Sequence, residues 1–362
     1  MKIIAKIFEK LGPQFDKGKI LSPFRPVYQA LENFFFQADL KTDNAPYGRD
    51  PIEIKRFMST VIIALVPSFI AALYFFGWRV LLLVIVSYVA GGAVEVLFAI
   101  LRKEEINEGF LVTGFIFPLI LPPGVPLWLV AVGIIFGVLV GKEVFGGTGR
   151  NVFNAALVGR GFLALGYPAI MTRSWMAPGN YPLGNLATPV SISTPDAITS
   201  ATPLVLGKGG ELAPIQDLLI GRIPGSAGET SALAIILGGV FLILVGVANW
   251  RTVFGVLVSF IGLGAFLRFL YPASVNPVWF NLFSGGILFG AFFMATDPVT
   301  GPITRSGKLV YGLLIGSVTI LIRFYSGFVE GVTFAILLGN IFAPLFDEVV
   351  IRNRIRRYAR ER

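Results

Sequence analysis

Apolar segments close to twenty residues long recur along most of this chain, and they constrain its fold more than any other feature. A helix of about twenty apolar residues crosses the roughly 30 Å hydrocarbon core of a bilayer. Of the 362 residues, 55% are hydrophobic and 14% are charged, whereas an average soluble domain is about 25% charged. A soluble core cannot hide that much apolar surface. We therefore predict an all-α protein integral to a lipid bilayer.

The apolar pattern predicts about ten transmembrane helices. Their expected ranges are 57–78, 80–101, 109–121, 127–145, 151–168, 230–249, 252–271, 278–296, 308–325 and 328–350. A polar connection rich in Pro, Ser, Thr and Gly separates the fifth span from the sixth. The expected regions are an amphipathic N-terminal extension (1–55), a first transmembrane repeat (56–168), an outer loop (169–229), a second repeat (230–350) and a basic tail (351–362).

Basic residues indicate how these spans are oriented, because cytoplasmic loops carry an excess of Lys and Arg. The basic residues on the side of the N-terminus are Arg102, Lys103, Lys142, Arg150, Arg251, Arg305, Lys308 and the arginines of the tail. The opposite short loops hold only Arg79 and Arg323. We therefore expect both termini in the cytoplasm and the 169–229 loop outside. Topology and contact with anionic lipid headgroups explain the net charge of +9 better than binding of nucleic acid does.

Two weak internal similarities indicate that the halves are related. Residues 154–160 resemble residues 334–340, at an offset of 180. Pro118, beside the Pro122-Pro123-Gly124 interruption, has its counterpart at the same offset in Pro298. Since five spans per half is an odd number, the repeats would be inverted, with broken helices that point to a central site. Ordinary turns between helical hairpins are the alternative explanation.

The chain contains no cysteine and no histidine. This excludes disulfides, Cys-ligated iron–sulfur clusters, His-ligated haem and conventional zinc sites built by this chain alone. If the protein handles electrons, it needs an organic cofactor. The outer loop contains the motif Asp196-Ala-Ile-Thr-Ser200-Ala201-Thr202. By its residues alone this is a polar loop with turn-forming residues, although a threonine hydroxyl can hold a flavin through a phosphoester.

The motif resembles the flavinylation signal of two paralogous membrane proteins. These are the B-type subunit (NqrB) of the sodium-translocating NADH:quinone oxidoreductase and the D-type subunit (RnfD) of the Rnf complex. The resemblance implies FMN esterified to Thr202 by a flavin transferase outside the membrane, with Asp196, Ser200 and Ala201 as parts of the signal. Ser200 departs from the glycine that is commoner there. Further blocks similar to this family occupy residues 142–151, 293–300 and 340–347.

The N-terminal extension and residues 102–110 and 223–230 favour NqrB, whereas residues 174–178 and the chain length favour the Rnf paralogue. We expect the NqrB type. The resemblance then implies a subunit of a redox-driven Na⁺ pump in the bacterial cytoplasmic membrane. With other membrane and peripheral subunits, it would pass electrons derived from NADH through covalent FMN and riboflavin to quinone, coupled to cation transport. It would not be active alone.

Several acids lie in or at the edges of the predicted spans: Glu95, Glu143, Asp297, Glu330 and Asp347. A carboxylate at mid-membrane is costly, so it usually faces a partner or an ion path. Glu95 is expected at mid-span, where an ion pair with Arg160 or Arg268 is the structural alternative. The resemblance implies that Glu95 and Asp347 belong to the cation path, although a position near the cytoplasmic end equally allows Asp347 to be a surface residue. Asp297 is a weaker candidate, since it could equally cap a half-helix.

Two pairs of small or amide residues are further candidates. Gly91 and Gly92 precede Glu95 by one helical turn, and their residue types alone indicate tight helix packing. The resemblance instead implies a quinone pocket at these glycines. Asn151 and Asn154 lie one turn apart at the expected start of the fifth span, where Asn151 would cap the helix. The resemblance implies that both amides contact a noncovalently bound riboflavin.

Two other classes of function fit the composition. One is a secondary transporter or channel with inverted repeats and no redox role. The other is a structural membrane anchor for soluble redox partners, which predicts that Glu95→Gln leaves ion transport intact. A covalently bound flavin is the feature that separates a redox subunit from the transporter.

Overall fold

The computed structural model describes residues 13, 54–103, 109–179, 201–272, 274–326, 328 and 331–360, and their regular structure is helical. The expected extension 1–55, Asp196, Ser200 and Glu330 therefore lie wholly or almost wholly outside the described residues. Six described helical segments are long and apolar enough to cross a membrane, and three shorter apolar helices accompany them. The prediction of an all-α integral membrane protein is confirmed.

In the part of the first half that the structure describes, the long helices are α3 (Ile54–Phe76), α4 (Arg79–Arg102), α5 (Gly109–Leu119), α6 (Leu127–Gly141) and α7 (Ala155–Gly166). A short 3₁₀ turn, Glu143–Phe145, extends α6. The second half contains α11 (Ala232–Val245), α12 (Trp250–Leu270), α13 (Val278–Phe283), α14 (Ile287–Phe289), α15 (Arg305–Tyr325) and α16 (Val332–Arg360). Helix α14 continues directly into a π-helical turn, η5 (Gly290–Met294). The connection between the halves carries α8 (Pro168–Arg173), α9 (Pro203–Lys208) and α10 (Ile215–Ile220).

One expected span is not a single helix. Residues 278–296 form α13 and the α14–η5 helix, separated by Ser284, Gly285 and Gly286. Gly285 has a φ of +67°, a left-handed conformation that glycine adopts without steric cost. The expected spans 109–121, 151–168 and 230–249 are helical but shorter than predicted. The broken and short helices therefore occur in both halves.

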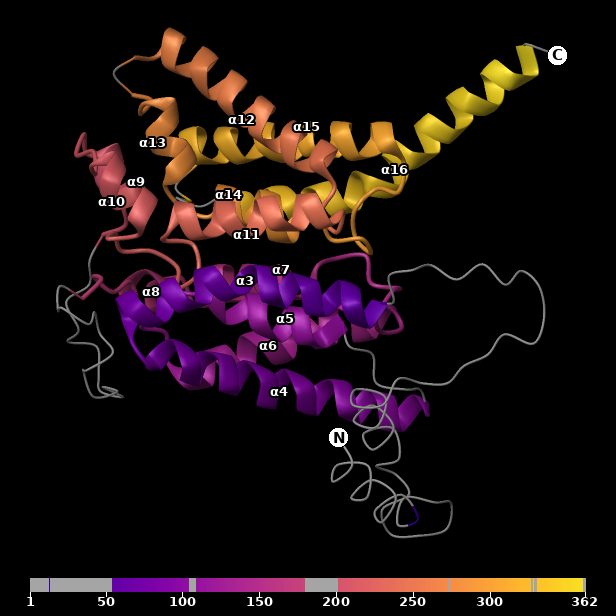
Figure 1. Cartoon of the computed structure of the whole chain (residues 1–362), viewed down its shortest axis with the longest axis horizontal. Coiled ribbons are helices and arrows are strands. Elements are labelled where there is room, and N and C mark those ends of the chain that lie inside the picture. The colour runs from indigo at the N-terminus through magenta and orange to yellow at the C-terminus, as the bar shows by residue number, and fades with distance from the viewer. Residues whose placement is uncertain are drawn as a thin grey trace.

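The two halves lie side by side, with α3 of the first packed along α11 of the second (Figure 1). Within the halves, α4 packs on α6 and α6 on α7, just as α12 packs on α15 and α15 on α16. These matched contacts are those expected of two related five-helix units. At the boundary, an added Cβ at Gly238 would lie 2.0 Å from the Ala64 carbonyl oxygen. The α3–α11 contact therefore depends on a glycine.

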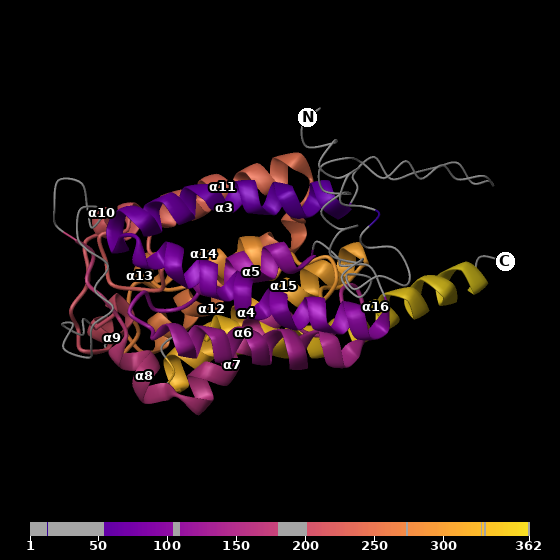
Figure 2. The same ribbon diagram turned by 90° about the horizontal axis from the view of Figure 1, so that it is seen from below.

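The first helix of the bundle starts, and the last helix leaves it, at the same end. Helix α3 begins at the end of the bundle from which the C-terminal part of α16 extends, while α8, α9 and α10 gather at the opposite end (Figures 1 and 2). We name the latter the loop end of the bundle. Arg323 does not lie in a short loop, as the sequence predicted, but is buried in the last turn of α15. Arg79 donates to the carbonyls of Pro123, Gly124 and Val125 and so fixes the turn after α5.

Candidate functional site

Helix α5 ends, and the α14–η5 helix begins, against one buried segment, residues 226–231, which we name the plug segment. Its Gly228 and Ala227 amides donate to the carbonyls of Leu119 and Leu121 at 2.7 and 3.0 Å. These bonds satisfy carbonyls at the C-terminal end of α5, which a buried helix end requires. On the other side of the plug segment, Glu229 packs against Gly286 at the start of the α14–η5 helix. The plug segment therefore fills the seam between the halves at the loop end.

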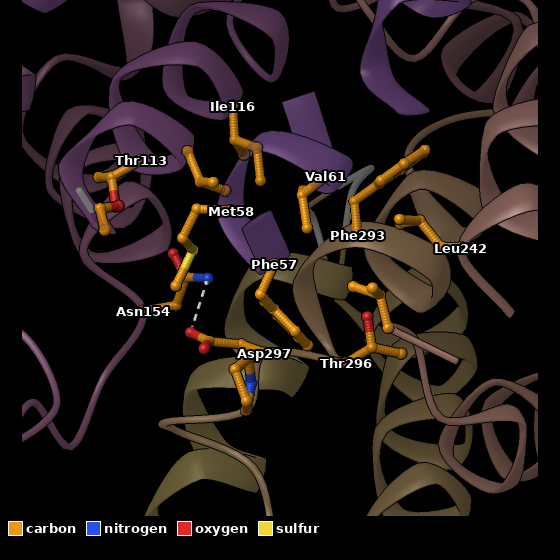
Figure 3. Close-up of a pocket in the computed structure, with 14 residues that line it drawn as sticks. Phe57, Met58, Val61, Thr113, Ile116, Asn154, Leu242, Phe293, Thr296 and Asp297 are labelled. Carbon is orange, nitrogen blue, oxygen red and sulfur yellow. Dashed lines mark hydrogen bonds between the residues drawn. The ribbon is translucent and has the colours of Figure 1, made fainter. Parts of the chain in front are cut away.

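A cavity of about 70 Å³ lies at the other end of this seam, between α3, α5, α11 and η5 (Figure 3). Most of its lining is apolar, including Met58, Val61, Leu242 and Phe293. The polar side chains are those of Thr113, Asn154, Thr296 and Asp297. A mostly apolar lining with a few convergent polar groups is typical of ligand sites, although pockets for whole cofactors are larger, about 300–1,000 Å³.

Asn154 and Asp297 meet across this cavity, one from each half. Asn154 caps α7, since its Oδ1 accepts from the Ala156 amide at 3.1 Å, and its Nδ2 donates to Asp297 Oδ2 at 3.4 Å. Asp297 also accepts from the Val299 amide and the Thr300 hydroxyl, at 3.0 and 3.1 Å. Desolvation raises the pKa of the Asp297 carboxyl, and these two hydrogen bonds act in the opposite direction. Asp297 thus closes a turn after a broken helix and also faces the cavity.

Asn151 does not cap α7, because the helix begins four residues later than the sequence suggested. Its Oδ1 accepts from the Gly149 amide at 3.3 Å, and its Nδ2 donates to the Phe153 carbonyl at 3.0 Å. Asn151 is therefore used by the turn between α6 and α7. Of the two asparagines, Asn154 lines the cavity, and a contact of either amide with riboflavin stays a prediction.

Glu95 is buried in α4, but its partner is neither Arg160 nor Arg268. Its Oε1 lies 2.5 Å from the ammonium of Lys142, at the C-terminus of α6. Arg268 instead donates to the Val275 carbonyl. Sequence reasoning missed Lys142 as the partner because it assigned this residue only to the topology signal. The ion pair between Arg102 and Glu143, at 2.7 Å, is a second pair formed by the same two parts of the chain.

Gly91 and Gly92 differ in their surroundings. An added Cβ at Gly91 would lie 2.7 Å from side-chain atoms of Phe110 and Ile134, whereas one at Gly92 would meet only Phe110, at 3.4 Å. Gly91 therefore permits the close approach of α4 to α5 and α6, as the packing interpretation expects. Gly92 is only partly buried, and the quinone pocket at these glycines stays a prediction.

Asp347 holds the start of α15. Its carboxylate accepts from the Ile303 amide at 2.7 Å, the Thr304 amide at 2.9 Å and the Thr304 hydroxyl at 2.6 Å. Thr304 is itself the N-cap of α15, accepting from the Gly307 amide. A negative charge at a helix N-terminus is favourable. Asp347 thus ties α16 to α15, which is a structural role that the sequence did not indicate.

Asp347→Ala should lower the stability of the protein by about 1–2 kcal/mol, the usual cost of losing a helix cap. The measurement is the apparent midpoint of thermal unfolding in detergent, in NaCl and in KCl. Because the lost bonds are internal, the midpoint should fall in both salts. Glu348→Ala is the matched control, since Glu348 is exposed and contacts Arg352 on its own helix. Equal midpoints for the two variants would contradict the capping role.

Thr202 is the N-cap residue of α9, at the loop end. Its hydroxyl makes no capping hydrogen bond to that helix, and Ala201 beside it is exposed. Thr202 itself is only 7% exposed and lines a small cavity with Ser226, Glu229 and Thr230. The hydroxyl is therefore accessible to another molecule only before the segment packs or when it opens. The described residues hold no cluster of acids suited to a metal ion.

Two matched helical halves, broken helices that meet at a seam and polar groups along it define a polytopic membrane protein of transporter-like architecture. A family model described as the NQR2, RnfD, RnfE family matches residues 41–356. The chain belongs to this family.

Individual relatives match over nearly their whole length. A protein from Ectopseudomonas mendocina, named as the B-type subunit (NqrB) of Na(+)-translocating NADH-quinone reductase, is 37% identical, with 98% of both chains covered. Proteins of the same name from Pseudomonas aeruginosa and Klebsiella pneumoniae are 36% identical, covering 98% and 97% of this chain and 98% of each relative. The resemblance inferred from short motifs is confirmed over nearly the whole chain.

Proposed function

We propose that this chain is the membrane subunit of a Na⁺-translocating NADH:quinone reductase that corresponds to NqrB. The names of the full-length relatives support this assignment over RnfD of the Rnf complex, although the family model includes both paralogues. Orientation follows the basic residues: the loop end faces outward, and the α3 start and α16 end face the cytoplasm.

One observation carries the transport part of this proposal. Asn154 and Asp297, from different halves, meet 3.4 Å apart across the cavity at the boundary. A polar contact between two packed units changes when the units move against each other. Since a bound ion's equilibrium shifts only through different interactions in two states, a site spanning the boundary suits a coupled pump. In this proposal Glu95, Asp297 and Asp347 belong to the cation path, with Lys142 as the counterion of Glu95.

We further propose that Thr202 holds FMN as a phosphoester and that Asn151 and Asn154 face riboflavin. Flavins supply electron transfer between two-electron and one-electron carriers. The Thr202 hydroxyl is suited to esterification because it is not occupied in capping α9. Asn154 lines the cavity, where its amide nitrogen donates to Asp297, and an uncharged donor of this kind suits the edge of a flavin ring. Gly91 and Gly92 would border the quinone.

Thr202→Ala should abolish covalent flavin. Wild-type protein, expressed with its flavin transferase and separated on a denaturing gel, is expected to fluoresce under ultraviolet light, because a phosphoester survives denaturation. The Thr202→Ala band should be dark. Thr172→Ala is the matched control, since Thr172 is an exposed threonine in α8 at the same end of the bundle, and its band should stay bright. A dark wild-type band would favour the non-redox transporter.

A further inference from the structure

Three ionised side chains that the proposed function does not use lie buried together at the loop end. Arg160 from α7 is 4% exposed, Glu229 of the plug segment 3%, and Arg323 from α15 6%. They come from both halves and from the connection between them. Buried charges of this kind are rare in membrane proteins and usually have a role in an ion or substrate path.

Glu229 pairs with Arg160, and Arg323 lies near it. Arg160 Nη1 is 3.5 Å from Glu229 Oε1, and the same guanidinium donates to Thr333 at 3.0 Å and to Ser226 at 3.4 Å. Arg323 lies close to the same place, since Gly285, whose added Cβ would lie 3.1 Å from Arg323 Nη2, lines one cavity with Glu229. Arg323 Nη1 donates to the Asn281 carbonyl at 2.5 Å, and its guanidinium stacks over Phe260. Arg160 therefore joins α7 to α16 and to the plug segment.

This cluster lies at the opposite end of the broken helix from the cavity. The eight residues of α14 and η5 span about 12 Å. Gly286, just before them, is so close to Glu229 that an added Cβ would lie 2.2 Å from Glu229 Oε1. Phe293 near their other end, and Asp297 beyond it, line the cavity. A path along the seam would therefore have to pass Glu229 and the two arginines to leave at the loop end.

Several buried polar atoms in and around this cluster lack hydrogen-bond partners in the part of the chain that the structure describes, which is unusual for a cluster with a purely structural role. Among the described residues, the buried atoms without a hydrogen-bond partner include Glu229 Oε2, Thr230 Oγ1, Ser284 Oγ, and Nε and Nη2 of Arg323. Each such group costs stability, and more so when it is charged. Buried polar groups left unsatisfied in a native protein call for a functional explanation.

We propose that Arg160 and Arg323, held in place by Glu229 and the plug segment, form an electrostatic barrier that closes the loop end of the seam to cations. This inference rests on the proposed cation transport. Fixed positive charge in a narrow, dry passage repels a cation strongly, because the local dielectric constant is low. Release of the cation then requires the positive charge of Arg160 and Arg323 to be displaced from the path or compensated by added negative charge.

The barrier lies next to Thr202. Thr202, Glu229 and Gly285 line the same small cavity, and an added Cβ at Gly285 would lie 3.1 Å from Arg323 Nη2. A change of charge on a group attached to Thr202 would therefore act directly on the two arginines. Negative charge added at Thr202 would weaken the positive barrier. Reduction of a group held there would therefore favour release of the cation to the outside.

The test is the passive Na⁺ leak of the whole complex in liposomes, under an imposed Na⁺ gradient and without an electron donor. Arg160→Gln removes positive charge and should raise the initial rate of Na⁺ entry by about tenfold or more. Glu229→Gln leaves the arginines less compensated and should not raise the leak. A structural ion pair predicts instead that both variants behave alike. Opposite effects from the two partners are therefore the signature of the barrier.

Three controls keep this test decisive. Arg160→Lys retains the charge and should leak as little as wild type, and so should Arg268→Gln, which loses only a bond to a loop carbonyl. If Arg160→Gln fails to assemble, Arg323→Gln is measured in its place with the same expectation. An unchanged leak in a folded arginine variant, or equal leaks for Arg160→Gln and Glu229→Gln, would overturn the barrier. Because no electron donor is present, this result does not depend on electron transfer through a flavin on Thr202.

Discussion

Replacing Lys142 with methionine should destabilise the protein by about 3–5 kcal/mol, the usual cost of removing one partner of a buried ion pair. The Lys142 ammonium lies 2.5 Å from Glu95, and the side chains of both residues are more than nine-tenths buried. The second carboxylate oxygen, Glu95 Oε2, has no hydrogen-bond partner among the described residues. The variant would therefore leave an uncompensated carboxylate between α4 and α6. The measurement is the apparent midpoint of thermal unfolding in detergent.

The double variant Lys142→Met with Glu95→Gln separates charge from packing. It removes both charges, so most of the lost stability should return, since replacing a whole buried pair costs far less than breaking one. Arg352→Met is the matched control, because the Arg352–Glu348 pair is largely exposed and such pairs contribute little. If Lys142→Met unfolds no earlier than Arg352→Met, Lys142 is not the counterion that holds Glu95.

Gly238→Ala should also be strongly destabilising, and it acts on the contact between the halves. An added Cβ would lie 2.0 Å from the Ala64 carbonyl oxygen, which belongs to the backbone of α3 and cannot rotate away. The variant must therefore push α11 away from α3. Overpacking of this kind costs about 1–3 kcal/mol or more. We expect the yield of folded protein and the midpoint of thermal unfolding to fall sharply.

Gly262→Ala is the matched control for this prediction. Gly262 also lies within a long apolar helix, α12, but an added Cβ there would have no neighbour within 4 Å. Alanine favours a helix over glycine by about 1 kcal/mol, so this variant should be as stable as wild type or more so. If Gly238→Ala and Gly262→Ala unfold at the same temperature, the halves are not held together as the structure describes.

The apolar pattern predicted the fold class because the length of a membrane helix follows directly from bilayer thickness. It did not predict where helices break. Residues 278–296 are apolar enough to read as one span, yet the chain turns at Gly285, whose positive φ is visible only in three dimensions. Arg323 was assigned to a loop because a charge normally marks the end of a span, whereas here it is buried at the end of α15.

The site was less predictable because its contacts join distant parts of the chain. Glu95 stood out as an acid within a span, but its partner depends on where α6 ends, and Lys142 at that end also fits a topology signal. Asp347 was expected in the cation path. Its hydrogen bonds with Thr304 could not be predicted, because they depend on α16 lying against the start of α15. The sequence did not indicate that Glu229 is buried, because a charged residue at the end of a polar loop is normally exposed to solvent.

The most direct test of the central claim is the mass of the peptide containing Thr202, from protein purified from its native host. A redox subunit with flavin esterified to Thr202 predicts one added FMN, joined with loss of water, and fragmentation that assigns it to this residue. If the peptide is recovered at its unmodified mass, with no FMN-bearing form, the electron-carrying role is contradicted and the non-redox transporter is favoured.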